Sequence, residues 1–166
     1  NKNTNLKVNE VLFYTEKPRV YAHIKPYLDK SLSERELQDK IFNIMIARNH
    51  VKELKKTIQK DGGLINAIIV SKINNKFYAI EGNSRLACYK SLLKTSTHWK
   101  EIKSIVTQRE LTKDEIFYLL NEEHIKGKTQ WSTYEKSNLL YSKHYADSVT
   151  IEKLAEIVGI SEQEVK

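Results

Sequence analysis

The chain has 166 residues, and its 28 lysines and arginines against 21 aspartates and glutamates give a formal net charge of +7. The single cysteine excludes an internal disulfide framework and a zinc site built from cysteines, and it favours a reducing, cytoplasmic location. No apolar run approaches the roughly 18 residues of a membrane span, so we expect no membrane partner. The basic balance favours anionic partners such as nucleic acids or nucleotides.

The N-terminal part predicts a strand followed by two helices. Residues 8–14 form a short apolar stretch that favours a strand leading into a loop. Ser33 and Glu36 have the spacing of a capping box, which predicts a helix from there to about Arg48. Residues 51–58 carry apolar side chains at helical spacing, and the glycines that follow Asp61 should end this second helix.

A hairpin and a third helix are predicted next. Residues 68–70 and 77–80 are rich in β-branched and aromatic side chains, and the Asn74-Asn75 pair between them is typical of a tight turn. An apolar stripe then predicts a helix over residues 85–93, with Leu93 on its buried face.

The rest of the sequence becomes helical after one more strand. Residues 102–106 favour a strand, whereas Thr112 begins a capping box and residues 150–158 have the pattern of a helix. We therefore expect an α/β fold with a small mixed sheet and packed helices over residues 1–110. An all-helical segment should occupy residues 111–166.

The sharpest local feature is Glu81-Gly82-Asn83-Ser84-Arg85, where a predicted strand turns through a glycine into a helix. Asn83 or Ser84 is the expected N-cap. Unpaired amides and a partial positive charge at a helix N-terminus stabilise an anion, and the Arg85 guanidinium can contact phosphate. Glu81 could orient Arg85, bind a bridging metal or act as a catalytic base. An ordinary glycine turn with a solvated arginine is the alternative.

The sequence of residues 61–92 resembles the N-terminal domain of the ParB/sulfiredoxin superfamily. Lys17-Pro18-Arg19 looks like an early box of that family, and residues 123–126 with Lys128 stand where a later box falls. In ParB proteins such boxes surround the triphosphate of bound CTP. The resemblance therefore implies nucleotide contacts by Gly82, Asn83, Ser84, Arg85, His124 and Lys126.

Two departures from the family pattern leave the nucleotide open between CTP and ATP. Asn83-Ser84-Arg85 replaces the double-arginine form, and the later box has lysine where glutamine and arginine are usual, with one apparent extra residue. Asn83 also stands at the position of the sulfiredoxin cysteine, so peroxiredoxin repair is not expected. Cys88, a helical turn further on, is expected to be a small buried side chain.

The end of the chain resembles the first half of a helix-turn-helix. Leu154-Ala155 with Gly159 has the spacing of its first helix and turn, and a recognition helix would begin near Ser161 as its N-cap. We expect Lys128 and Ser161 to contact DNA. Because the pattern ends before the second helix is complete, we interpret the chain as a fragment, and the full-length protein is expected to be a homodimer.

These features predict a ParB-like DNA-binding protein of plasmid or chromosome partition, or of transcriptional regulation, whose conformation is switched by a nucleoside triphosphate. Slow hydrolysis of the triphosphate is left open, as is a Mg²⁺ ion carried by its phosphates. The five histidines lack ligand spacing, so no structural metal site is expected. An enzyme (a free-serine kinase with Glu81 as its base, an ATPase or a nuclease) is the rival, and a protein-interaction module that has lost its nucleotide is a third possibility.

Overall fold

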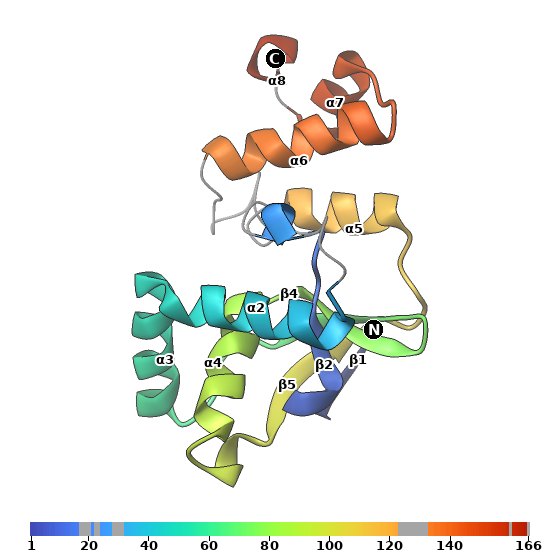
Figure 1. Ribbon diagram of the computed structural model, residues 1–166. Helices are drawn as coiled ribbons and strands as arrows, with labels where there is room; N and C mark the ends of the chain where they lie inside the picture. The colour runs from blue at the N-terminus through green and yellow to red at the C-terminus, as the bar shows by residue number, and fades with distance from the viewer. Residues whose placement is uncertain (17–20, 22–23, 28–31, 123–132, 160, 166) are drawn as a thin grey trace. The chain divides into compact units, whose positions relative to one another are not determined.

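The computed structural model describes residues 1–16, 21, 24–27, 32–122, 133–159 and 161–165 (Figure 1). The described residues up to Leu111 form one compact unit, and those from Thr112 onward form a second. Within these ranges, no helix combines the length and apolarity that crossing a membrane requires.

The first unit contains a five-stranded mixed sheet, in the order β1-β5-β3-β4-β2. β1 pairs antiparallel with β5, and β3 pairs antiparallel with β4, whereas the β3–β5 and β2–β4 pairs are parallel. The small mixed sheet expected from the sequence is therefore confirmed. The strands are β1 (Lys2–Lys7), β2 (Val11–Phe13), β3 (Ile68–Ile73), β4 (Lys76–Glu81) and β5 (Glu101–Val106).

β3 and β4 form the predicted hairpin. Asn74 and Asn75 connect the strands with φ angles of 48° and 66°. Two successive residues with positive φ fit a hairpin turn that matches the twist of the strands, and asparagine tolerates this backbone region better than most residues do.

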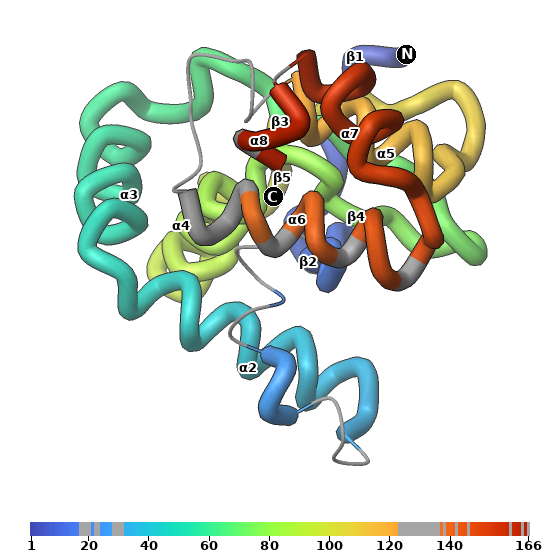
Figure 2. The backbone as a smooth tube through the Cα atoms, turned by 90° about the horizontal axis from the view of Figure 1, so that it is seen from above, coloured from blue at the N-terminus to red at the C-terminus, as the bar shows by residue number. Residues whose placement is uncertain are grey.

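The helices that accompany the sheet include α2 (Glu34–Ala47), α3 (Asn49–Asp61) and α4 (Asn83–Leu93). Ser33 and Glu36 form the predicted capping box at the start of α2. α3 ends at Gly62, whose φ of 72° is the left-handed conformation of a glycine C-cap. The three helices pack on one another, as two views agree (Figures 1 and 2), and α4 also contacts β2, β3 and β4.

α4 is the central helix of this unit. Leu86, Ala87, Cys88 and Tyr89 are consecutive and all buried, so apolar contacts surround this helix on several sides rather than along one stripe. The expected burial of Cys88 is confirmed. Leu93 is only partly buried, which corrects the narrower stripe predicted from the sequence.

One strand was missed, and two local predictions are wrong. β1 was not expected because its sequence is polar. Its strand conformation comes from backbone pairing with β5, which its composition does not predict. Val8–Glu10 is a 3-10 helix, so the strand predicted from residue 8 begins only at Val11. The N-cap of α4 is Gly82, not Asn83 or Ser84, because the turn requires a positive φ at that residue.

The second unit consists of helices in its described parts: α5 (Lys113–Leu120), α6 (Thr133–Ala146), α7 (Ile151–Val158) and α8 (Glu162–Val165). The predicted capping box at Thr112 is present. Lys143 on α6 pairs with Asp114 on α5 and with Asp147, which links two helices through a buried lysine.

The region of the predicted helix-turn-helix lies in this unit. Thr150 caps α7, and Gly159 ends the helix with a φ of 72°. α8 begins at Glu162, next to Ser161. A complete helix-turn-helix is not shown by these residues and stays a prediction.

Candidate functional site

The turn between β4 and α4 requires glycine at position 82. Gly82 has a φ of 99°, and a Cβ atom built there would lie 2.4 Å from Cγ2 of Ile68 on β3. Neither the backbone conformation nor the space accommodates a side chain. The adjacent strand thus closes one side of the turn, and the chain enters α4 directly from the sheet.

The first turn of α4 has no side-chain cap. Leu86 N donates to the Gly82 carbonyl at 2.9 Å, which begins the helical hydrogen-bond pattern, and the N-cap residue, Gly82, has no side chain that could accept from the preceding amides. Such amides carry the positive end of the helix dipole. This arrangement can stabilise an anion that approaches Asn83, Ser84 and Arg85.

Asn83 adds a buried polar group to this corner. Its side chain is 4% exposed, and its Nδ2 donates to the carbonyl oxygen of Tyr14 at a long 3.4 Å. The Oδ1 atom has no hydrogen-bond partner among the described residues. A buried acceptor without a partner costs free energy on the order of 1–3 kcal/mol, so this atom would gain from a ligand donor or a hydrated cation.

Arg85 has a structural role in this corner. Its Nη1 donates to the carbonyl oxygens of Asn66 and Ala67 at 2.9 and 2.8 Å, and its Nη2 lies 3.6 Å from Oε1 of Glu81. The guanidinium therefore holds the loop before β3 against α4. Nε has no hydrogen-bond partner among the described residues, so this edge of the group can still meet an anion.

Glu81 lies beside Arg85 and is well covered. Its side chain is 13% exposed, against 21% for the Arg85 side chain. Orientation of Arg85, one of the three roles considered for Glu81, is consistent with this ion pair. The phosphate contacts expected of Gly82–Arg85 and the catalytic role of Glu81 stay predictions.

Two neighbours of the corner did not emerge from the sequence. The Tyr14 carbonyl holds Asn83, and the Tyr14 phenol donates to Oε2 of Glu16 at 3.1 Å. Burial, reinforced by the Glu16 carboxylate, raises the pKa of the Tyr14 phenol above its ordinary value of 10.0. Ile68 packs against Gly82 in the turn. Both residues come from distant parts of the sequence, so local patterns could not reveal them.

The remaining predicted residues lie in the second unit or outside the described residues. His124, Lys126 and Lys128 lie outside the described residues, as does the Lys17-Pro18-Arg19 box. Ser161 is exposed in the second unit, immediately before α8. In the described part of the chain, no group of three or more His, Cys, Asp or Glu side chains could hold a metal ion.

The fold and the corner together define a class: a small α/β domain whose strand-glycine-helix junction has the form of an anion site. Residues 30–122, more than half of the chain, match the family described as the ParB N-terminal domain. The chain belongs to this family. A search of curated protein sequences gives no match.

Solved structures of ParB proteins have the same fold. The C-terminally truncated chromosome-partitioning protein ParB from Caulobacter crescentus, complexed with CTP-γ-S, superposes with a TM-score of 0.50 at 14% identity, covering 99% of this chain and 75% of that one. The same protein complexed to the centromeric parS site superposes with a TM-score of 0.50 at 13% identity, covering 98% of this chain and 67% of that one. A Pnob8-like ParB-N domain superposes with a TM-score of 0.54 at 15% identity, covering 98% of this chain and 65% of that one. At these identities the similarity shows the fold alone.

Proposed function

We propose that this chain is a DNA-binding protein of the ParB type in which a nucleoside triphosphate controls DNA engagement. The triphosphate contacts the backbone amides of Gly82, Asn83, Ser84 and Arg85 and the side chains of the last three. His124 and Lys126 complete the site. A Mg²⁺ ion on the phosphates is a further ligand of this site. The helical second unit, with Lys128 and Ser161, provides the DNA contacts, and the full-length protein acts as a homodimer.

The observation that carries this proposal is the uncapped start of α4. Gly82 admits no side chain, and Asn83 keeps a buried oxygen without a partner in the described structure. A corner that served only as a turn would gain by capping its own amides and pairing that oxygen. The family membership and the CTP-γ-S complex of the Caulobacter protein agree with nucleotide binding.

Titration calorimetry with CTP, ATP, GTP and UTP in the presence of Mg²⁺ tests the nucleotide claim. We expect one triphosphate to bind in preference to the others and to raise the melting temperature by mass action. Absence of heat and of a melting shift with all four nucleotides would contradict the proposal.

Replacement of Ser84 separates binding from folding. Ser84→Asp places a negative charge in the first turn of α4, where the helix dipole stabilises it, but the same charge repels a phosphate. We expect Ser84→Asp to weaken nucleotide binding roughly tenfold or more while the protein stays folded. The matched neutral variant Ser84→Asn should retain most of the affinity, and equal affinities of the two variants would place the phosphates elsewhere.

The proposed DNA binding is tested by its dependence on salt and by comparison of two lysine variants. Lys128→Ala should weaken duplex binding and reduce the slope of log affinity against log salt by about one, since a phosphate contact releases one counterion. Lys103→Ala removes the same charge from an exposed position on β5 and serves as the matched control. Equal losses in both variants would indicate a general effect of charge.

The rival enzymatic function has one structural observation in its favour. Glu81 is a covered carboxylate beside the same corner, 3.6 Å from Nη2 of Arg85, where it could accept the proton of a substrate hydroxyl. Incubation with ATP or ADP and free serine distinguishes the functions. Formation of phosphoserine that Glu81→Gln abolishes would favour a kinase, whereas the DNA-binding proposal expects none.

A further inference from the structure

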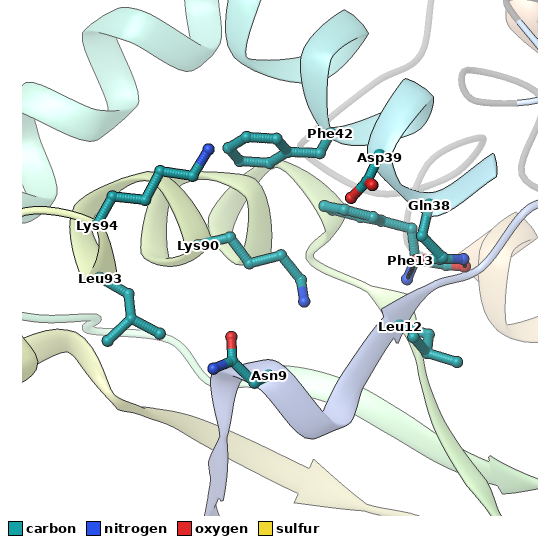
Figure 3. A pocket seen from close by; sticks show the side chains of 9 residues that line it. All are labelled: Asn9, Leu12, Phe13, Gln38, Asp39, Phe42, Lys90, Leu93 and Lys94. Atoms are coloured by element: carbon teal, nitrogen blue, oxygen red, sulfur yellow. Dashed lines mark hydrogen bonds between the residues drawn. The ribbon is translucent and has the colours of Figure 1, made fainter. Parts of the chain in front are cut away.

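A pocket opens in the first unit near the C-terminal end of α4 (Figure 3). Its volume is 420 Å³, and it is lined by residues of α2, α4, β2 and the 3-10 helix before β2. This volume falls in the range of small-molecule sites, roughly 300–1,000 Å³. The nucleotide corner is at the other end of α4, so this pocket is a separate site.

Two aromatic rings form apolar walls of the pocket. Phe13 on β2 is 1% exposed, and Phe42 on α2 is 8% exposed. The Gln38 side chain accepts from the Phe13 amide at 2.7 Å and donates to the Phe13 carbonyl at 3.0 Å. This pair of bonds ties β2 to α2, so the wall that Phe13 forms is fixed before any ligand arrives.

Lys90 of α4 and Lys94, the C-cap residue of that helix, bring cationic groups to the same pocket. Lys90 and Lys94 are one helical turn apart and therefore share a face. Nζ of Lys90 lies 5.7 Å from the centre of the Phe13 ring, and Nζ of Lys94 lies 4.4 Å from that of Phe42. Figure 3 shows the end of the Lys94 side chain beside the Phe42 ring and the Lys90 side chain extending below the two rings.

The amine of Lys90 is held in place and largely desolvated. It donates to the Val8 carbonyl at 3.1 Å. Burial lowers the pKa of Lys90 to about 8, against the opposing effect of Asp39 on α2. The dipole of α4 accounts for lysines in its last turn, but it does not account for an open cavity with aromatic walls around them.

The charges in the lining favour an anion. Lys90 and Lys94 outnumber Asp39, and Lys94 has no carboxylate partner among the described residues. We infer that this pocket binds a small aromatic carboxylate, with its ring against the apolar side of the pocket at Phe42 and its carboxylate at the amines of Lys90 and Lys94. Charge-assisted hydrogen bonds and aromatic contacts would both contribute to the affinity.

The inference is tested with 1-naphthoate and its uncharged analogue 1-naphthamide, titrated into the whole chain and followed by amide NMR shifts. We expect naphthoate to bind roughly tenfold more tightly than naphthamide, because a charge-assisted hydrogen bond is worth about that factor. The shifted amides should lie in α2, β2 and the last turns of α4. Equal affinities, or shifts centred elsewhere, would overturn the inference.

Two variants and a control locate the anion. Lys94→Met, at an exposed position, should weaken naphthoate binding roughly tenfold without affecting the fold. Lys90→Met should do the same, and its folding is checked by denaturant unfolding. Lys103→Met removes a lysine from β5 and should leave the affinity unchanged. Unchanged affinity in Lys94→Met and Lys90→Met would contradict the site.

The pH profile gives an independent readout. The ionisable side chains that line the pocket are Lys90 and Lys94 on α4 and Asp39 on α2, while β2 and the 3-10 helix contribute none. Because Lys90 loses its proton above about pH 8, naphthoate affinity should fall between pH 7 and pH 9.5. In Lys90→Met this part of the pH dependence should disappear, and its persistence would exclude Lys90 from the site.

Discussion

At the scale of single residues, the corner after β4 has a glycine whose conformation is fixed, followed by a buried asparagine with an unpaired amide oxygen. Gly82 is fixed both by its backbone conformation and by the proximity of Ile68, whereas Asn83 is buried with one end of its amide unpaired in the described structure. Arg85 ties the loop before β3 to α4 through Nη1. Its Nε stays available to a ligand. Adjacent residues therefore stabilise the turn and provide the proposed ligand contacts.

Gly82→Ala should destabilise the first unit strongly. The new Cβ would lie 2.4 Å from Ile68 Cγ2, and alanine would have to adopt a φ of 99°. Strain and overpacking together should cost about 2–5 kcal/mol. The matched control is Gly62→Ala, where φ is also positive but no atom lies within 4 Å of the new Cβ. Urea unfolding should show the larger loss for Gly82→Ala, and equal losses would show that the contact with Ile68 is unimportant.

Lys90→Met should change how stability depends on pH. Burial lowers the pKa of Lys90 from 10.5 to about 8, so between these values the unfolded chain holds a proton that the folded chain has released. Lys90 therefore opposes folding below pH 8, and this penalty fades as the pH rises toward 10.5.

The methionine variant should be roughly 1–3 kcal/mol more stable than the wild type at pH 7, after allowance for the lost hydrogen bond to Val8. The difference in free energy of unfolding should shrink at pH 10. Lys94→Met, exposed on the same helix, is the control. A difference between Lys90→Met and wild type that stays constant over this range would contradict the desolvation of Lys90.

At the scale of secondary structure, the sequence predicted the elements that carry their own end signals. The capping boxes at Ser33 and Thr112 and the glycine ends at Gly62 and Gly159 placed four helix ends within a residue or two. β1 was missed because its strand character comes from pairing with β5, a distant segment.

The candidate site likewise has features that the sequence predicts and features that it does not. The glycine turn and the helix that follows it were predictable, because a strand-glycine-helix junction is local. The contacts of Arg85 with Asn66 and Ala67 and the packing of Ile68 on Gly82 were not, because tertiary structure creates them. Lys90 gave one signal, a charged residue within the apolar run of α4, but only the fold shows the pocket around it.

The hairpin between β3 and β4 allows a test at this scale. Asn75 has a φ of 66°, which glycine adopts without cost. Asn75→Gly should stabilise the first unit by about 0.5–1 kcal/mol, and Asn75→Val should destabilise it by a similar or larger amount. Thermal unfolding of both variants measures this. The reverse order would contradict the turn geometry.

At the scale of the whole molecule, the net charge of +7 and the family membership agree with an anionic partner. The chain belongs to a family whose Caulobacter member has been captured with CTP-γ-S and with parS DNA. If a triphosphate controls DNA engagement here, nucleotide and DNA should alter each other's affinity by the same factor, as linkage requires. Independent affinities, measured with each ligand alone and with both, would contradict the switch while leaving the two sites possible.

The central claim is that a triphosphate occupies the start of α4. An amide NMR titration with CTP and Mg²⁺, repeated with ATP, tests it most directly, because it reports on Asn83, Ser84 and Arg85 individually. We predict that the largest saturable shifts occur at these amides and at the Asn83 side-chain amide, and that Ser84→Asp removes them while Ser84→Asn keeps them. Unchanged signals at these residues with both nucleotides would contradict the account.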